Sequence, residues 1–230
     1  MTTKEIKEII DNLNHEISVN LNAEDYYNRG HAYQDLKIYD KAIMDYKKAI
    51  KLDPNISEIY NNLGTIYFSI NKYDEAIKNW SKAIQKDQKH LLAYLNRGDV
   101  FVLQKKYIEA INDFSKVIEI DPNAYMVYER RAEVYKKIGK FELSLIDYNR
   151  ILFDIKTVSR VYYLRGLLYI KMENFSEAIN DFTQAIIIDP MILKYYRNRA
   201  IVYKKLGKIK DYENDISKIE EIKKKTKNGI

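Results

Sequence analysis

A 34-residue period runs through almost the whole chain and constrains its fold more than any other feature. A small residue recurs at this spacing, and a tyrosine lies four residues before each one. The small residues are Gly30, Gly64, Gly98, Ala132, Gly166 and Ala200, and the tyrosines are Tyr26, Tyr60, Tyr94, Tyr128, Tyr162 and Tyr196. Six units therefore follow one another without insertion or deletion, which is typical of a repeat architecture.

Each unit predicts two helices joined by a short turn. In the third unit, Tyr94, Gly98 and Phe101 share one helix face, and a second apolar stripe runs from Tyr107. Pro122 ends that stripe because proline lacks the backbone N–H that a helix needs. Neither helix is long enough to bury its stripe alone, so we expect each unit to pack its remaining apolar face on the next.

The pattern resembles the tetratricopeptide repeat family over about nine-tenths of the chain. Besides the tyrosine and the small residue, the resemblance includes an aromatic three residues after the small residue, a second-helix alanine and a closing proline. Two second helices depart from it, with Ser144 and Tyr212 at the alanine position. The resemblance implies an all-α fold, a right-handed α-solenoid of six helix-turn-helix repeats at residues 23–56, 57–90, 91–124, 125–158, 159–192 and 193–226.

The first 22 residues lie outside the repeat register. Their apolar residues form one helical stripe, and charged residues cover the rest: the stripe is Ile6, Ile9, Ile10, Leu13 and Ile17. We expect a capping helix, because the end of a repeat stack needs a cover with a polar outer face. An amphipathic arm for a partner or a membrane is the alternative, although the nearly balanced charges argue against an anionic membrane. Residues 227–230 are expected to form a C-terminal tail.

An arginine and an aspartate recur together. The arginine precedes the small residue, and the aspartate follows 16 residues later: the pairs are Arg29 and Asp45, Arg97 and Asp113, Arg131 and Asp147, Arg165 and Asp181, and Arg199 and Asp215. Repeat 2 lacks both, with Leu63 and Asn79 instead. Our hypothesis is an ion pair that joins the two helices of each repeat, since arginine binds a partly buried carboxylate through two hydrogen bonds. The alternative is two unrelated charges that face solvent.

No group of residues predicts catalysis or a bound cofactor. His15, His31 and His90 lie far apart and match no metal-ligand spacing. The chain has no cysteine, and its glycines belong to helix packing or turns rather than to a phosphate-binding loop. We therefore expect neither an enzyme, nor a cofactor, nor a metal site.

The resemblance implies a concave groove, lined by the first helices, that binds a peptide or protein segment. Carried onto this chain, it assigns these groove residues: Tyr27, His31, Asn62, Thr65, Phe68, Asn96, Asp99, Arg130, Tyr163, Leu164, Leu167, Ile170, Arg197 and Asn198. The family's clamp for a chaperone tail is incomplete. Asn96 and Arg130 match it, but Asn61, Thr65 and Met126 occupy its other positions. The sequence therefore argues against chaperone-tail binding.

The groove lining changes along the chain. Repeats 1 to 3 place polar side chains there, and the amides of Asn61, Asn62 and Asn96 can hydrogen-bond a peptide backbone. Repeat 5 is apolar at four positions where solvent is expected, with Lys136, Arg197 and Lys204 around them. Such a patch marks an interaction site. Packing of repeat 5 on itself or on a second copy remains the alternative.

Net charge and hydropathy limit the kinds of partner that we expect the chain to bind. The charge is +6, and its positive excess is densest at Lys223–Lys225 and Lys227, where we expect a frayed chain end rather than a nucleic-acid site. No apolar run is long enough to span a membrane, and residues 1–6 do not start an apolar signal segment. The sequence thus predicts a cytoplasmic, non-catalytic scaffold for a protein or peptide, a monomer or weak homodimer. The alternatives are a self-associating module or nucleic-acid binding through the basic end.

Overall fold

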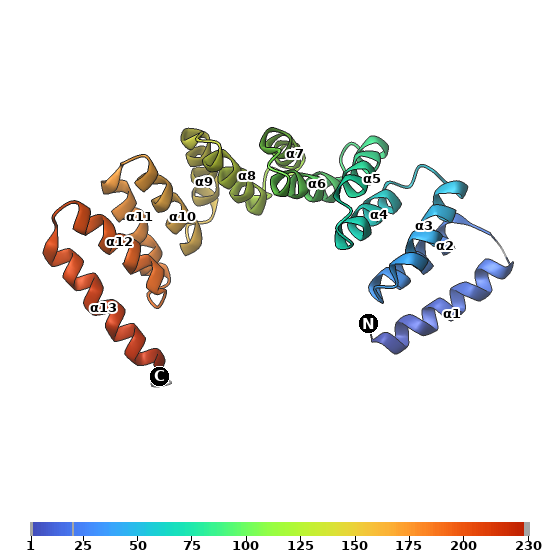
Figure 1. Cartoon of the computed structure of the whole chain (residues 1–230), viewed down its shortest axis with the longest axis horizontal. Coiled ribbons are helices and arrows are strands. Elements are labelled where there is room, and N and C mark those ends of the chain that lie inside the picture. Colours follow the sequence, from blue (N-terminus) through green and yellow to red (C-terminus); the bar gives the residue numbers. More distant parts are fainter. Residues whose placement is uncertain (1, 20, 228–230) are drawn as a thin grey trace. The chain divides into compact units, whose positions relative to one another are not determined.

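The structure is a computed structural model that describes residues 2–19 and 21–227 (Figure 1). Within these residues the regular elements are thirteen α-helices and no strand. They are α1 (Thr3–Val19), α2 (Ala23–Asp35), α3 (Tyr39–Leu52), α4 (Ser57–Ser69), α5 (Tyr73–Lys86), α6 (Leu91–Leu103), α7 (Tyr107–Ile120), α8 (Tyr125–Lys137), α9 (Phe141–Asp154), α10 (Ser159–Lys171), α11 (Phe175–Ile188), α12 (Leu193–Lys205) and α13 (Ile209–Lys227). The predicted all-α repeat fold is confirmed.

The chain forms two compact units, unit 1 (Met1–Asp121) and unit 2 (Pro122–Ile230). Unit 1 contains α1 to α7, and unit 2 contains α8 to α13. In both, the two helices of a repeat pack on each other, and α1 packs on α2. Residues 228–230 of the predicted tail lie outside the described residues, whereas Lys227 belongs to α13.

A tight turn joins the two helices of each repeat. In repeat 1, the Lys37 N–H donates to the Gln34 carbonyl at 2.8 Å, and the Ile38 N–H donates to the Tyr33 carbonyl at 2.8 Å. This pattern ends a helix with one residue in the left-handed region. Only repeats 4 and 6 use glycine there, and the residues with positive φ are Lys37, Asn71, Lys105, Gly139, Glu173 and Gly207. The turn is therefore imposed by helix packing, and not by a glycine in every repeat.

The small first-helix residue packs against an aromatic ring of the second helix. A Cβ added at Gly64 would lie 2.5 Å from Trp80 Nε1, and one added at Gly98 would lie 2.7 Å from a ring carbon of Phe114. The ring follows the small residue by 16 positions and is buried in repeats 1 to 5: the residues are Tyr46, Trp80, Phe114, Tyr148 and Phe182. Repeat 6 has Ile216 at this position instead.

The predicted arginine–aspartate pairs are confirmed in all five repeats. Arg97 donates from Nε and Nη2 to the two carboxylate oxygens of Asp113 at 2.8 and 2.7 Å. The same two-fold contact joins Arg29 and Asp45, Arg131 and Asp147, Arg165 and Asp181, and Arg199 and Asp215. In repeat 2, Leu63 is buried in an apolar cluster, and Asn79 donates to the Glu75 carbonyl on its own helix.

The same arginines also reach the preceding second helix. Arg97 Nη1 donates to Ser81 Oγ at 2.8 Å, and Arg199 Nη1 donates to Thr183 Oγ1 at 2.8 Å. In repeat 1, Arg29 Nη1 donates to Asn14 Oδ1 of α1 at 2.8 Å. Helix α1 therefore contacts α2 as the second helix of a preceding repeat would, and its role as a cap stays a prediction.

The basic end of the chain is helical, so the predicted frayed end is wrong as far as Lys227. Lys223 Nζ lies 2.6 Å from Glu220 Oε1, and Lys225 Nζ lies 3.0 Å from Glu221 Oε1. Pairs at these spacings stabilise a helix by a few tenths of a kcal/mol each, roughly 0.2–0.5. They also reduce the positive charge that a nucleic acid would contact.

Candidate functional site

Four of the predicted groove residues line one pocket in unit 1. The pocket has a volume of about 310 Å³ and lies among α4, α5 and α6. Helix α4 supplies Thr65 and Phe68, and α6 supplies Asn96 and Asp99; Ser69 and Trp80 complete the lining. We call it the Trp80 pocket. Two adjacent first helices thus present polar and aromatic groups to the same space.

Trp80 is fixed by contacts on two sides. Its indole N–H donates to the backbone carbonyl of Asn61 at 3.2 Å, and its ring packs against Gly64. Its ring centroid lies 6.2 Å from that of Phe68, and its side chain is 2% exposed. Trp80 is absent from the predicted groove residues because that prediction covers only the first helices. The signal was present, since an aromatic recurs at this position in five repeats.

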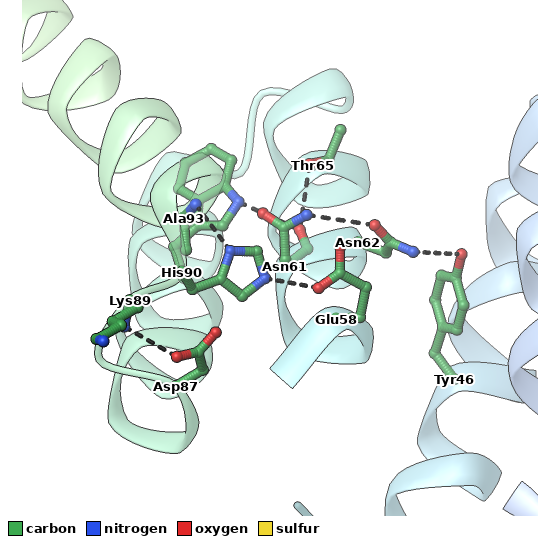
Figure 2. Close-up of polar contacts among 10 residues, drawn as sticks. Tyr46, Glu58, Asn61, Asn62, Thr65, Asp87, Lys89, His90 and Ala93 are labelled. Atoms are coloured by element: carbon green, nitrogen blue, oxygen red, sulfur yellow. Dashed lines mark hydrogen bonds and ion pairs between the residues drawn. The ribbon is translucent and has the colours of Figure 1, made fainter. Parts of the chain in front are cut away.

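Asparagine amides connect the Trp80 pocket to repeat 1 (Figure 2). Asn62 Nδ2 donates to the Tyr46 hydroxyl at 3.4 Å, and Asn61 Nδ2 donates to Asn62 Oδ1 at 3.4 Å. Thr65 Oγ1 donates to the Asn61 backbone carbonyl at 3.1 Å. Asn61 is buried, so its predicted place in the groove lining is wrong. Asn62 is only half-buried.

His90 caps a helix in this region. Its Nδ1 accepts from the Ala93 N–H at 3.4 Å at the start of α6, and its Nε2 lies 2.9 Å from Glu58 Oε2 (Figure 2). Nδ1 therefore serves as a helix cap, and Nε2 lies beside a carboxylate. Among the described residues, no group of histidine, aspartate and glutamate side chains is arranged to hold a metal ion.

Tyr27 and His31 lie on α2 beside the capping helix. His31 and Asn28 line a pocket of about 380 Å³ together with Ile6, Ile9 and Leu13 of α1. The Tyr27 ring centroid lies 6.0 Å from that of Tyr46, and burial raises the pKa of the Tyr27 hydroxyl. The groove positions of repeat 1 therefore share their surroundings with α1.

In unit 2, the four apolar groove residues of repeat 5 are half-buried rather than exposed to solvent. Three of them pack against a buried cluster that contains Phe182 and Val202; they are Tyr163, Leu167 and Ile170. The fourth half-buried groove residue is Leu164. The expectation that all four positions face solvent is wrong, because α10 uses part of this surface to contact α11 and α12.

Two predicted groove residues meet directly in unit 2. Asn198 Nδ2 donates to the Tyr163 hydroxyl at 3.3 Å, and the Lys194 ammonium lies 4.7 Å from the Tyr163 ring centroid. Burial raises the pKa of the Tyr163 hydroxyl. Tyr163 is therefore held in place, with its hydroxyl used inside the repeat stack.

The groove positions of repeat 4 form a charged network. The Glu133 carboxylate accepts hydrogen bonds from the Tyr148 hydroxyl and from the Lys136 ammonium. Arg160 Nη2 lies 2.7 Å from Glu129 Oε1. Burial raises the pKa of the Glu129 carboxyl, and Arg160 opposes that rise. Arg130 is half-buried on α8. The carboxylates and cations of this network largely neutralise one another.

A pocket in unit 2 includes Arg197, the last cation among the predicted groove residues. It has a volume of about 360 Å³ between α12 and α13, and it is lined by Arg197, Ala200, Ile201, Lys204, Tyr212 and Ile216. We call it the Ile216 pocket. The sequence pointed to Arg197 and Lys204 but not to Tyr212 and Ile216, because these two residues lie on the second helix α13.

The outer face of α9 is apolar, which sequence analysis also missed. Phe153 is 78% exposed and Ile146 is 60% exposed, and Leu143 shares their face of the helix. At the same register, the other second helices have Lys51, Gln85, Glu119, Ile187 and Glu221 in place of Phe153.

Comparisons with known proteins agree with the repeat structure. A tetratricopeptide repeat model matches residues 23–56, 92–124 and 159–191, and two further models of this repeat match residues 64–104 and 45–78. Together they cover more than half of the chain. No curated protein matches its sequence. In the described part of the chain, no helix is long and apolar enough to cross a membrane.

Solved structures share the fold at low sequence identity. The C-terminal part of a TPR repeat-containing protein from Cytophaga hutchinsonii is 16% identical with a TM-score of 0.83, covering 95% of this chain and 90% of its own. The MamA protein is 19% identical with a TM-score of 0.70, covering 76% and 96%. YrrB, described as a TPR protein with an unusual peptide-binding site, is 20% identical with a TM-score of 0.65, covering 77% and 91%. From its repeats and the matching models, the chain belongs to the tetratricopeptide repeat family.

Proposed function

We propose that this protein is a non-catalytic scaffold that binds a peptide or protein segment along the first helices of its repeats. The observation that carries the proposal is the Trp80 pocket, where Thr65, Phe68, Asn96 and Asp99 converge from two adjacent first helices. Convergent polar groups around an apolar floor are the usual composition of a binding pocket. The peptide-binding site described for YrrB supports peptide binding as a use of this fold.

An extended peptide suits the chemistry of this surface. The amides of Asn62 and Asn96 can both donate to and accept from a peptide backbone. One side chain of the peptide would enter the Trp80 pocket and contact the rings of Phe68 and Trp80. Within unit 2, the half-exposed parts of Leu164, Leu167 and Ile170 offer a separate apolar surface to a partner segment, so the remaining predicted groove residues stay part of the proposal.

Trp80 provides its own reporter, because it is the only tryptophan of the chain. Peptides would be selected from a display library on the wild-type protein and then titrated while Trp80 emission is recorded. We expect peptide binding to shift the Trp80 emission. Asn96→Ala and Phe68→Ala should each weaken the peptide affinity by about tenfold, which corresponds to roughly 1.4 kcal/mol.

The control is Gln85→Ala, which removes an exposed amide from the second helix α5 and should leave binding unchanged. Selected peptides that bind all three variants as tightly as the wild type would move the site away from the Trp80 pocket. A selection that yields no peptide at all would contradict peptide binding itself.

Self-association is the second candidate function, and the outer face of α9 favours it. Exposed apolar residues that share a helix face are typical of an interaction surface. Light scattering over a concentration series would show a mass that rises with concentration, and Phe153→Glu would abolish that rise. A constant monomer mass would exclude this candidate.

The cytoplasmic location of the protein stays a prediction from the sequence.

A further inference from the structure

Repeat 6 differs from the other repeats at one core position, and a pocket lies at that position. In repeats 1 to 5 the second helix places an aromatic ring against the small first-helix residue, and each ring is at most 2% exposed. Repeat 6 instead has Ile216 beside Ala200, and Ile216 is 38% exposed. An isoleucine side chain is smaller than a ring, and the Ile216 pocket of about 360 Å³ lies beside it.

The pocket has apolar walls and a positively charged mouth. Ala200, Ile201, Tyr212 and Ile216 form the walls, and Ile201 is 61% exposed. Arg197 and Lys204 lie on the same helix as Ile201, four residues before it and three residues after it, and therefore on one face of α12. The pocket lining contains two cations and no carboxylate.

Some other cations of unit 2 are paired with a carboxylate. Lys136 and Arg160 each contact a glutamate, and Arg199 contacts Asp215. Among the residues that the structure describes, no carboxylate pairs with Arg197 or Lys204. The Lys204 ammonium lies 5.7 Å from the Tyr212 ring centroid, and both cations are exposed. Their charge is therefore available to a ligand.

We infer that the Ile216 pocket binds an acidic peptide segment, with an apolar side chain in the pocket and carboxylates on Arg197 and Lys204. This inference rests on the proposed function and names the partner's chemistry. Seven residues of helix span about 10 Å, and four residues of an extended peptide span about 13 Å. A Glu-x-Leu-x-Glu segment places all three side chains on one face, and the flexible side chains bridge the difference in length.

The walls also argue for a peptide over a nucleic acid. Bases bind single-stranded sites by stacking on aromatic faces. Here three of the four wall residues are aliphatic. The pocket thus fits a leucine-like side chain better than a base, and the cations fit carboxylates that lie on either side of it.

The test uses a fluorescein-labelled Glu-x-Leu-x-Glu peptide and fluorescence anisotropy with the full chain. The informative variant is Ile216→Phe, which restores the ring of the other repeats and fills the pocket while both cations remain. Repeat 4 already combines Ala132 with the buried ring of Tyr148, so the ring and an alanine are compatible. We expect Ile216→Phe to keep or raise the melting temperature and to weaken binding by at least about tenfold.

Charge variants and matched peptides complete the test. Arg197→Gln and Lys204→Gln should each weaken binding by about two- to five-fold and reduce its salt dependence. Glu-x-Ala-x-Glu and Lys-x-Leu-x-Lys peptides should bind more weakly than the acidic leucine peptide. Tight binding of the acidic peptide to Ile216→Phe would overturn the pocket assignment. Equal binding of the alanine peptide, or tighter binding of a single-stranded oligonucleotide, would overturn the peptide chemistry.

The outcomes separate this inference from the proposed function. If the acidic peptide does not bind the wild type but selected peptides still shift Trp80 emission, the inference fails alone. If neither binds, both fail. A mass in light scattering that falls from dimer to monomer with Ile216→Phe would make a second copy the occupant, which also overturns the inference.

Discussion

At the scale of single residues, the recurring arginine makes the most contacts per side chain. Arg97 binds Asp113 through two hydrogen bonds, reaches Ser81 on the preceding second helix, and lies within 6 Å of the rings of Tyr94 and Phe101. Asp113 is almost fully buried, and burial raises the pKa of its carboxyl while Arg97 opposes that rise. The pair therefore joins two helices, and removal of one partner alone leaves the other charge without its counter-ion.

Asp113→Ala should destabilise the protein strongly, because it leaves the Arg97 guanidinium buried without its carboxylate. Loss of one partner of a buried pair costs about 3–5 kcal/mol. The double change Arg97→Leu/Asp113→Asn reproduces the residues of repeat 2, where Leu63 is 3% exposed in an apolar cluster. Chemical denaturation would measure both, and we expect the double variant to be clearly the more stable. Equal losses would contradict a paired role.

At the scale of elements, α1 substitutes for a second helix. Its Ile6 and Ile10 form a buried cluster with Ala32 of α2, and Leu13 is buried as well. Asn14 accepts from Arg29 as residues of α5 and α11 accept from Arg97 and Arg199. The repeat register does not reach α1, yet the contacts of the register continue into it. Helix α1 thus repeats at α2 the kind of contact that joins neighbouring repeats.

Ile10→Asp should detach α1 from α2, because it places a charge at a residue that is 8% exposed. Loss of the burial of one isoleucine costs about 1.5–3 kcal/mol, and the buried charge adds to this loss. Hydrogen exchange should accelerate in α1 and α2. The matched control is Ile9→Asp, since Ile9 is 37% exposed on the same helix. Identical exchange rates in the two variants would mean that α1 is not held by this face.

At the scale of the whole molecule, stability should be a sum of repeats and of contacts between neighbouring repeats. Within unit 1 and within unit 2, contacts between repeats are made mainly by helices that are adjacent in the chain. A defect in one repeat is therefore expected to open that repeat and its neighbours before the rest of the chain.

Phe182→Ala tests this locality, because Phe182 is fully buried in unit 2. The lost core contacts cost about 3–5 kcal/mol. Hydrogen exchange should accelerate in α10 to α12, while α3 to α5 keep most of their protection. Ile187→Ala is the control, since Ile187 is 66% exposed on the same helix as Phe182. Uniform acceleration along the chain would show that the protein unfolds as one cooperative unit.

Several features could be predicted because they depend on residue spacing alone. The 34-residue period determines the helix pairs, since each apolar stripe must be covered by a neighbour. The constant 16-residue spacing and the joint loss of arginine and aspartate in repeat 2 predicted the Arg–Asp pairs, because loss of one partner leaves the other charge uncompensated. Thr65, Phe68, Asn96 and Asp99 converge on one pocket because their spacing places them on the same faces of α4 and α6.

Depth of burial, by contrast, was decided by tertiary structure. A helical register tells which face a side chain occupies, but not how far neighbouring side chains cover it. Asn61 is therefore buried where the sequence predicts a groove residue, and the apolar residues of repeat 5 are half-covered by α11 and α12. The two pockets depend on Trp80 and Ile216, which come from second helices, and only packing shows that these reach the surface of the first helices.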